Sequence, residues 1–314
     1  MRKRSTISCD AWRRSAGSGA PWHGTLGASC QGRVGYAACV RPTNEELSQL
    51  SARERLAFEL ADFCVRPAFT EISGSYLAAV MGTMIGSCGG RRLDIHGLEH
   101  IAPLGPHARI LLLANHRSFF DFFTVLYVLF FRTKLPRRLF FPTRGSFFYD
   151  HPAGPLVNLA MSAMRMFPPV LRDTKKRAWN EYMLKRTIDE LRVPGTIVGL
   201  HPEGTRNKSD DPYALLPAQP GVGKVALAAD FAHVVPVFVL GMSNELRKEL
   251  AWNFTAAGSH RISVRFGAPI DLSELRKRPP KLTVAKRAAD MCLDAIRVLA
   301  AEDRAARSVT LRVP

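Results

Sequence analysis

The chain has 314 residues, 46% of them hydrophobic, which is enough to bury a sizeable core in one large or two smaller domains and argues against disorder throughout. The net charge of +17 indicates nucleic acid, an anionic membrane surface or a phosphorylated substrate as partner, or simply a solvated basic surface. The 6 cysteines show neither a C-x-x-C pair nor metal-ligand spacing, which disfavours a zinc site and a disulfide framework and fits a reducing, cytosol-facing compartment.

Residues 1–42 are rich in Arg, Gly, Ser and Ala and poor in acids. They lack the apolar centre that a secretory signal needs. A transit peptide and sequence upstream of the true start are alternatives. We predict a disordered basic tail.

Residues 43–90 are predicted to form a small helical unit associated with a membrane. Residues 43–46 have the cap and acidic first turn of a helix start, and the apolar spacing that follows predicts two helices broken near Pro67. Residues 72–90 are uncharged but contain glycines, so their hydrophobicity is marginal for a membrane span. We expect them to lie on a membrane or in the core.

From residue 91 to the end, short apolar runs alternate with segments long enough for helices. The runs are 93–98, 109–115, 138–143, 196–201, 233–241 and 261–267, and the helical segments include 119–131, 173–192, 221–231 and 284–307. This alternation predicts an α/β domain over residues 91–314, with a mixed, mainly parallel sheet flanked by helices.

The stretch LLANHRSFFD, residues 112–121, places His116 and Asp121 where a predicted strand ends and a helix begins, a common place for ligands in α/β sheets. Inside a regular helix the two side chains would be about 140° apart, so they meet only if His116 precedes the helix and folds back. A carboxylate on one imidazole nitrogen leaves the other free as a general base. Alternatively, Ser118 and Asp121 form a capping box.

A second strand runs into the loop 199–210, GLHPEGTRNKSD. Arg206 and the backbone N–H groups can hold a phosphate or a hydroxylated acceptor, while Glu203 accepts from a substrate hydroxyl. Taken alone, the loop is equally an ordinary glycine turn with its charges in water. Two polar clusters at strand ends together favour a site.

Four motifs together resemble the glycerol-3-phosphate and lysophosphatidic-acid acyltransferase family. In chain order they are N-H-x-x-x-x-D at 115–121, Arg172 in MFPPVLRD, P-E-G-T-R at 202–206 and Pro236 in HVVPVFVLG. The resemblance covers about residues 90–270. The chain departs from it at His201, where relatives commonly carry an aromatic residue, and around 167–169 and 218–221.

The resemblance implies an O-acyltransferase. His116, with Asp121 behind it, would take the proton from an acceptor hydroxyl that attacks the thioester of acyl-CoA or acyl carrier protein, with no metal and no other cofactor. Arg172 and Arg206 would bind the acceptor phosphate, and Glu203 and Gly204 would shape the site. Thr205 lies in the same substrate-binding motif.

The reaction implied is the acylation of a lysophospholipid, most simply 1-acylglycerol-3-phosphate to phosphatidic acid. Another lipid or an amine as acceptor, and a non-catalytic membrane-binding homologue, are the alternatives. Nucleic acid is not expected as a partner, because no nucleic-acid-binding motif accompanies the charge.

Such acceptors reside in bilayers, so we expect a lipid surface as partner and a location on the cytoplasmic face of a membrane. The apolar segment 119–131 is predicted to be a core helix, whereas the basic loop after it and residues 72–90 are predicted to contact lipid. The basic cluster 172–186 fits a solvated face, a membrane contact, a grip on coenzyme A phosphates or a carrier-protein contact equally well.

Overall fold

The computed structural model describes residues 41–310 except 136–137, 146–148, 150 and 172, so nearly all of the predicted tail lies outside the described residues. A six-stranded sheet has the order β1-β8-β7-β2-β6-β3. Its strands are β1 (Leu93–His96), β2 (Ile110–Ala114), β3 (Arg138–Phe140), β6 (Thr196–Leu200), β7 (His233–Leu240) and β8 (Ile262–Phe266). The pair β7–β8 is antiparallel and its other neighbouring pairs are parallel. The predicted α/β class is confirmed.

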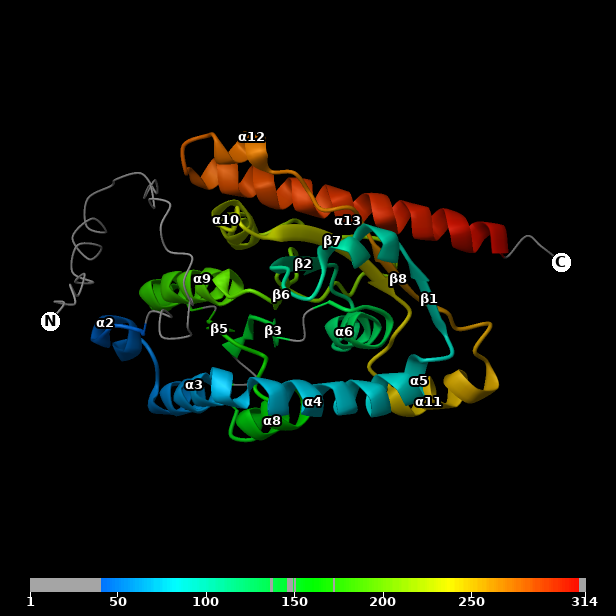
Figure 1. Ribbon diagram of the computed structural model, residues 1–314, viewed down its shortest axis with the longest axis horizontal. Coiled ribbons are helices and arrows are strands. Elements are labelled where there is room, and N and C mark those ends of the chain that lie inside the picture. The colour runs from blue at the N-terminus through cyan, green and yellow to red at the C-terminus, as the bar shows by residue number, and fades with distance from the viewer. Residues whose placement is uncertain (1–40, 136–137, 146–148, 150, 172, 311–314) are drawn as a thin grey trace, which may run out of the picture.

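The central strands β2, β6 and β7 are mostly apolar and buried because helices cover both faces of the sheet. Figure 1 shows α10 (Pro220–Ala228), α12 (Ser273–Arg276) and α13 (Leu282–Thr310) on one side and α6 (Asp121–Arg132) on the other. The helix α9 (Arg177–Arg192) follows the 3-10 turn η6 (Thr174–Lys176) and contacts β6 and α10.

The helix α6 is a core helix, as its composition predicts. Most of its twelve residues are buried, Asp121 among them, while Phe131 near its end is half exposed. The helix is apolar nearly all round because it lies between the sheet and the N-terminal helices. A lipid-facing role for most of this segment is therefore excluded.

The N-terminal helices run along the far side of α6 (Figure 1). They are α2 (Asn44–Ser48), capped by Thr43 in a capping box, α3 (Ala52–Cys64), η2 (Pro67–Phe69), α4 (Thr70–Val80), the π-helix η3 (Met81–Ile85) and α5 (Gly86–Gly89). A Cβ added at Gly82 would lie 3.1 Å from the Phe131 ring, and one at Gly86 would lie 3.2 Å from the Tyr127 ring. The glycines thus let this apolar segment pack closely on α6.

Several elements were not predicted from the sequence. They are α8 (Gly154–Ser162), α11 (Leu246–Thr255), the 3-10 turns η4 (Leu98–His100) and η5 (Ala102–Leu104), and a small parallel sheet of β4 (Thr143–Arg144) and β5 (Pro169–Val170). Within the described part of the chain, no helix is both long enough and apolar enough to cross a membrane.

A buried ion pair ties the N-terminal helices to the sheet. The guanidinium of Arg92, just after α5, lies 2.5 Å from the Glu249 carboxylate of α11, and both side chains are fully buried. Arg92 also donates to the carbonyls of Cys88, Gly241 and His260. Four segments therefore depend on one side chain.

Candidate active site

The candidate site lies at the carboxyl ends of β2, β6 and β7, where ligands bind in open α/β sheets. Asn115 follows β2, and its buried side-chain amide exchanges hydrogen bonds of 2.8 and 2.9 Å with the backbone of Val239 in β7. The side chain thereby continues the β2–β7 pairing after the β2 backbone has left the sheet. This anchor fixes the point at which His116 emerges.

His116 meets Asp121 in the way that the sequence predicts. Asp121 is the first residue of α6, His116 precedes the helix, and the imidazole Nδ1 lies 3.2 Å from the Asp121 Oδ2. The same Oδ2 accepts the N–H groups of Arg117 at 2.6 Å and of Ser118 at 2.8 Å. Since these partners are donors and the helix N-terminus carries partial positive charge, they all favour the ionised carboxylate.

The capping-box interpretation of Ser118 is correct in part. The Asp121 carboxylate does accept the Ser118 N–H, but the Ser118 Oγ accepts from the N–H of Phe120 at 3.1 Å and not from that of Asp121. Asn244, after β7, also holds this turn through the Phe119 N–H at 2.8 Å. Asp121 therefore orders the turn and holds His116 at the same time.

Glu203 holds the backbone of the loop after β2, which carries His116. Its Oε1 accepts the His116 N–H and its Oε2 accepts the Leu216 N–H, each at 2.8 Å, and the side chain is buried. The His116 carbonyl in turn accepts the Asn207 N–H at 2.7 Å. Both carboxylate oxygens thus have backbone partners, whereas the sequence suggested a substrate hydroxyl.

The rest of the P-E-G-T-R motif forms a turn beside His116. Gly204 has a φ of +64°, and a Cβ there would lie 2.9 Å from the Gln219 side chain, so the backbone conformation and the space both favour glycine. Thr205 is partly buried and Arg206 is exposed. No hydrogen bond or ion pair joins the Arg206 guanidinium to another described residue, so it is available to an anion. Arg172, the other predicted anion-binding residue, lies outside the described residues.

Burial sets the protonation of the pair. It lowers the pKa of His116 to about 4, and the positive charge of Arg206 adds to this effect. It raises the pKa of Asp121 to about 7, against the opposing influence of His201 and of the Arg117 and Ser118 N–H groups. The imidazole is therefore neutral at pH 7, with Nδ1 directed at Asp121 and Nε2 left to act as a base.

His201 was noted in the sequence only as a departure from the family pattern. In the structure its ring stacks on the His116 ring, with centroids 3.8 Å apart and planes 9° apart. Its Nδ1 donates to the Ala114 carbonyl at 2.9 Å. The sequence signal was the replacement of a usual aromatic residue by another planar ring.

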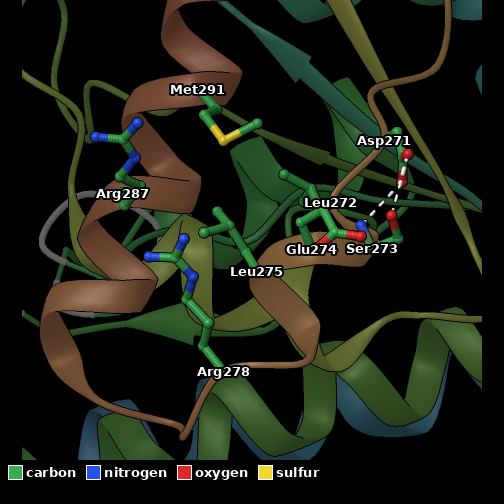
Figure 2. Close-up of a pocket in the computed structure, with 8 residues that line it drawn as sticks. All are labelled: Asp271, Leu272, Ser273, Glu274, Leu275, Arg278, Arg287 and Met291. Carbon is green, nitrogen blue, oxygen red and sulfur yellow. Dashed lines mark hydrogen bonds between the residues drawn. The ribbon is translucent and has the colours of Figure 1, made fainter.

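A cavity of about 240 Å³ lies away from this site, between α12 and α13 (Figure 2). Arg278, Arg287, Leu275 and Met291 are among its lining residues, and none of the predicted site residues is. Among the described residues, no cluster of His, Cys, Asp and Glu side chains is arranged to hold a metal ion.

Comparison with known proteins gives a family match that spans the candidate site. Residues 92–240 match the family model described as Acyltransferase, and this range includes His116, Asp121 and the turn 203–206. No curated protein matches the chain. The match supports an acyltransferase domain of the phospholipid/glycerol acyltransferase superfamily in this stretch, and with it general acyltransferase activity of the O-acyltransferase type.

Proposed function

We propose that the acyltransferase domain of residues 92–240 moves a fatty acyl group from acyl-CoA or acyl carrier protein to a lysophospholipid hydroxyl, most simply from 1-acylglycerol-3-phosphate to phosphatidic acid. The observation that carries this proposal is the bond of His116 Nδ1 to Asp121 at a strand-to-helix junction. The domain match supports the reaction type, and the resemblance of the motifs supports the acceptor class.

In the proposed reaction, the His116 Nε2 takes the proton from the acceptor hydroxyl while the hydroxyl oxygen attacks the thioester carbonyl. The C–S bond then breaks, and the imidazolium, which Asp121 stabilises, gives its proton to the departing thiolate, so the products are the ester and the free thiol and the histidine ends neutral. The His116 side chain is 21% exposed, so part of the ring can be reached by an acceptor. General-base help of this kind contributes about 10²- to 10⁴-fold.

Arg206 is the described residue best suited to bind the acceptor phosphate. It is exposed, and its charge already acts on His116, so an anion bound there would lie near the base. Arginine presents paired N–H donors that match phosphate oxygens. The resemblance assigns Arg172 the same role. An acceptor without phosphate, either another lipid or an amine, is the alternative that acceptor specificity would reveal.

We also propose that the protein works on the cytoplasmic face of a membrane. Four helices, α3, α4, α8 and α11, lie along one side of the molecule (Figure 1). Each exposes apolar side chains three or four residues apart, so each has an apolar face. These exposed residues are Leu56, Leu60 and Phe63 of α3, Ile72 and Tyr76 of α4, Leu156 and Leu159 of α8, and Leu250 and Phe254 of α11, here called the apolar side.

Basic residues accompany the apolar side. The guanidinium of Arg66 lies 5.1 Å from the centre of the Phe63 ring, and that of Arg91 lies 5.9 Å from the Phe254 ring. Both arginines are exposed. Aromatic and basic side chains together suit the interface of an anionic bilayer, where the ring enters the headgroup region and the cation stays with the phosphates.

The test of the proposed function is the release of thiol from acyl-CoA and from acyl carrier protein by the purified protein in lipid vesicles. Lysophosphatidic acid, glycerol 3-phosphate, a lysophospholipid with a bulkier headgroup and a lipid amine are compared as acceptors. We expect the fastest release, with phosphatidic acid as product, when lysophosphatidic acid is present. A faster reaction with the amine would refute it.

A further inference from the structure

Two histidines, not one, form the core of the candidate site. The rings of His116 and His201 are nearly parallel, with centroids 3.8 Å apart. His201 also contacts the buried Phe122 of α6, with centroids 4.1 Å apart and planes at 45°. The three rings form a continuous contact from the partly exposed His116 into the core.

The orientation of His201 is fixed by the sheet. β2 and β6 pair side by side as far as Leu113 and Leu200. One residue further on, the His201 Nδ1 donates to the Ala114 carbonyl at 2.9 Å, so a side chain continues the contact between the strands. Because a carbonyl can only accept, Nδ1 carries the hydrogen, which fixes the tautomer and limits rotation of the ring.

The bond to Asp121 restrains the His116 ring at one atom, Nδ1, and does not by itself set the tilt of the ring plane. We propose that His201 is a positioning residue that holds the plane of the His116 imidazole by stacking, so that Nε2 faces the acceptor hydroxyl. The inference rests on the base role of His116 proposed above. His201 itself touches no reacting atom. Its ring, stacked on His116, contributes more to the orientation of the base than its hydrogen bond to Ala114 does.

The two properties of His201 can be separated by substitution. His201→Phe keeps an aromatic ring for His116 and removes the donor to Ala114. His201→Asn keeps an amide N–H close to the position of Nδ1 and removes the ring. His201→Ala removes both and serves as a second ring-free variant if His201→Asn does not fold.

The environment of His116 gives a readout that does not depend on turnover. Burial lowers the pKa of its imidazole, and the groups that face it are Asp121, Arg206, Glu203 and His201. The first three are unchanged in every variant. Loss of the His201 ring admits water to one face of His116, so we expect its pKa to rise toward 6.5 in the ring-free variants and to stay low in His201→Phe.

The experiment combines NMR titration of His116 with the kinetics of the three variants and their thermal unfolding. We expect kcat to fall at least about 10-fold in folded His201→Asn with KM nearly unchanged. We expect His201→Phe to keep most of the wild-type kcat. Wild-type kcat and an unchanged His116 pKa in His201→Asn would overturn the inference, as would equal losses in His201→Phe and His201→Asn. A wild type without acyl transfer would instead refute the proposed function, and the titration would still test the stacking.

Discussion

The Glu203 carboxylate accepts the backbone N–H of His116 at 2.8 Å, although 87 positions separate the two residues along the chain. The loop after β6 therefore holds the loop after β2 by its main chain, while Asp121 holds the same residue by its side chain. The candidate base is fixed from two directions by two different carboxylates. Each of them has its own expected effect on activity.

Replacement of Glu203 should displace His116. In Glu203→Gln one oxygen becomes an NH₂ donor that faces a backbone N–H, so either His116 or Leu216 loses its acceptor. A shift of the base of about 1 Å can cost about 10²-fold, and we expect kcat to fall by about 10- to 10²-fold. Steady-state kinetics would measure this.

Glu274→Gln is the matched control, because Glu274 of α12 forms an exposed ion pair with Lys277, which follows the helix. It should keep the wild-type kcat. Wild-type kcat in Glu203→Gln would show that this contact does not position His116.

The pH dependence of the reaction should follow the pair His116–Asp121. The active form needs neutral His116, whose pKa is lowered to about 4, and ionised Asp121, whose pKa is raised to about 7. Above about pH 5 His116 is already neutral. The active form then accumulates as the Asp121 carboxyl loses its proton near pH 7. We expect kcat/KM to rise with pH to a plateau, with a midpoint near 7. A profile that is flat between pH 5.5 and 8 would contradict this assignment.

Arg206→Ala should weaken binding of a phosphate-bearing acceptor, because the guanidinium is exposed near the base and free for an anion among the described residues. Loss of a charge-assisted contact of about 1.5–3 kcal/mol predicts a KM for lysophosphatidic acid about 10- to 100-fold higher. The KM for monoacylglycerol should not change. The control is Arg297→Ala, at an exposed ion pair of α13. Equal KM changes for both acceptors would exclude phosphate recognition by Arg206.

The apolar side should govern membrane binding. Leu56 and Ile72 are 69% and 72% exposed, and we expect the double substitution Leu56→Glu and Ile72→Glu to reduce co-flotation with anionic vesicles by more than about 10-fold. Leu282→Glu with Val298→Glu is the matched control, since these residues of α13 are exposed to a similar degree elsewhere on the molecule. Equal losses in both double variants would refute the assignment of the apolar side to lipid.

The fold depends on the buried pair of Arg92 and Glu249. Glu249→Ala leaves a buried guanidinium without its counter-charge, and we expect a loss of about 3–5 kcal/mol in the free energy of unfolding, measured by chemical denaturation. Lys248 lies on the same helix and forms an exposed pair with Glu245, which precedes the helix; Lys248→Ala should change stability by less than about 1 kcal/mol. A Glu249→Ala protein with wild-type stability would contradict the account of this contact.

Much of the sheet follows from the sequence because its central strands are buried and mostly apolar, as in the run Ile110–Ala114. The contact of His116 with Asp121 also follows, since its geometry depends on a local junction. The short β4 and β5 do not, because two-residue strands leave no periodic pattern. The partners of Glu203 could not be predicted either, since they are backbone groups brought near by the fold.

The contact of His201 with His116 could not be predicted from the sequence motifs. The sequence shows that a ring occupies an unusual place, but the stack on His116 depends on the side-by-side ends of β2 and β6. Similarly, nothing local indicates that Asn115 pairs with the backbone of Val239 more than a hundred residues away. Such contacts arise from tertiary structure, and they are the ones that orient the site.

The central claim is that His116 is the catalytic base of an acyl transfer. The most direct test compares thiol release from acyl-CoA in the presence of lysophosphatidic acid by wild type, His116→Ala and His96→Ala. His96 pairs with Asp94 at 2.9 Å on β1 and is therefore a matched histidine–carboxylate pair in another place. We expect a rate at least about 10²-fold lower in folded His116→Ala and a wild-type rate in His96→Ala. Wild-type turnover in His116→Ala would contradict it.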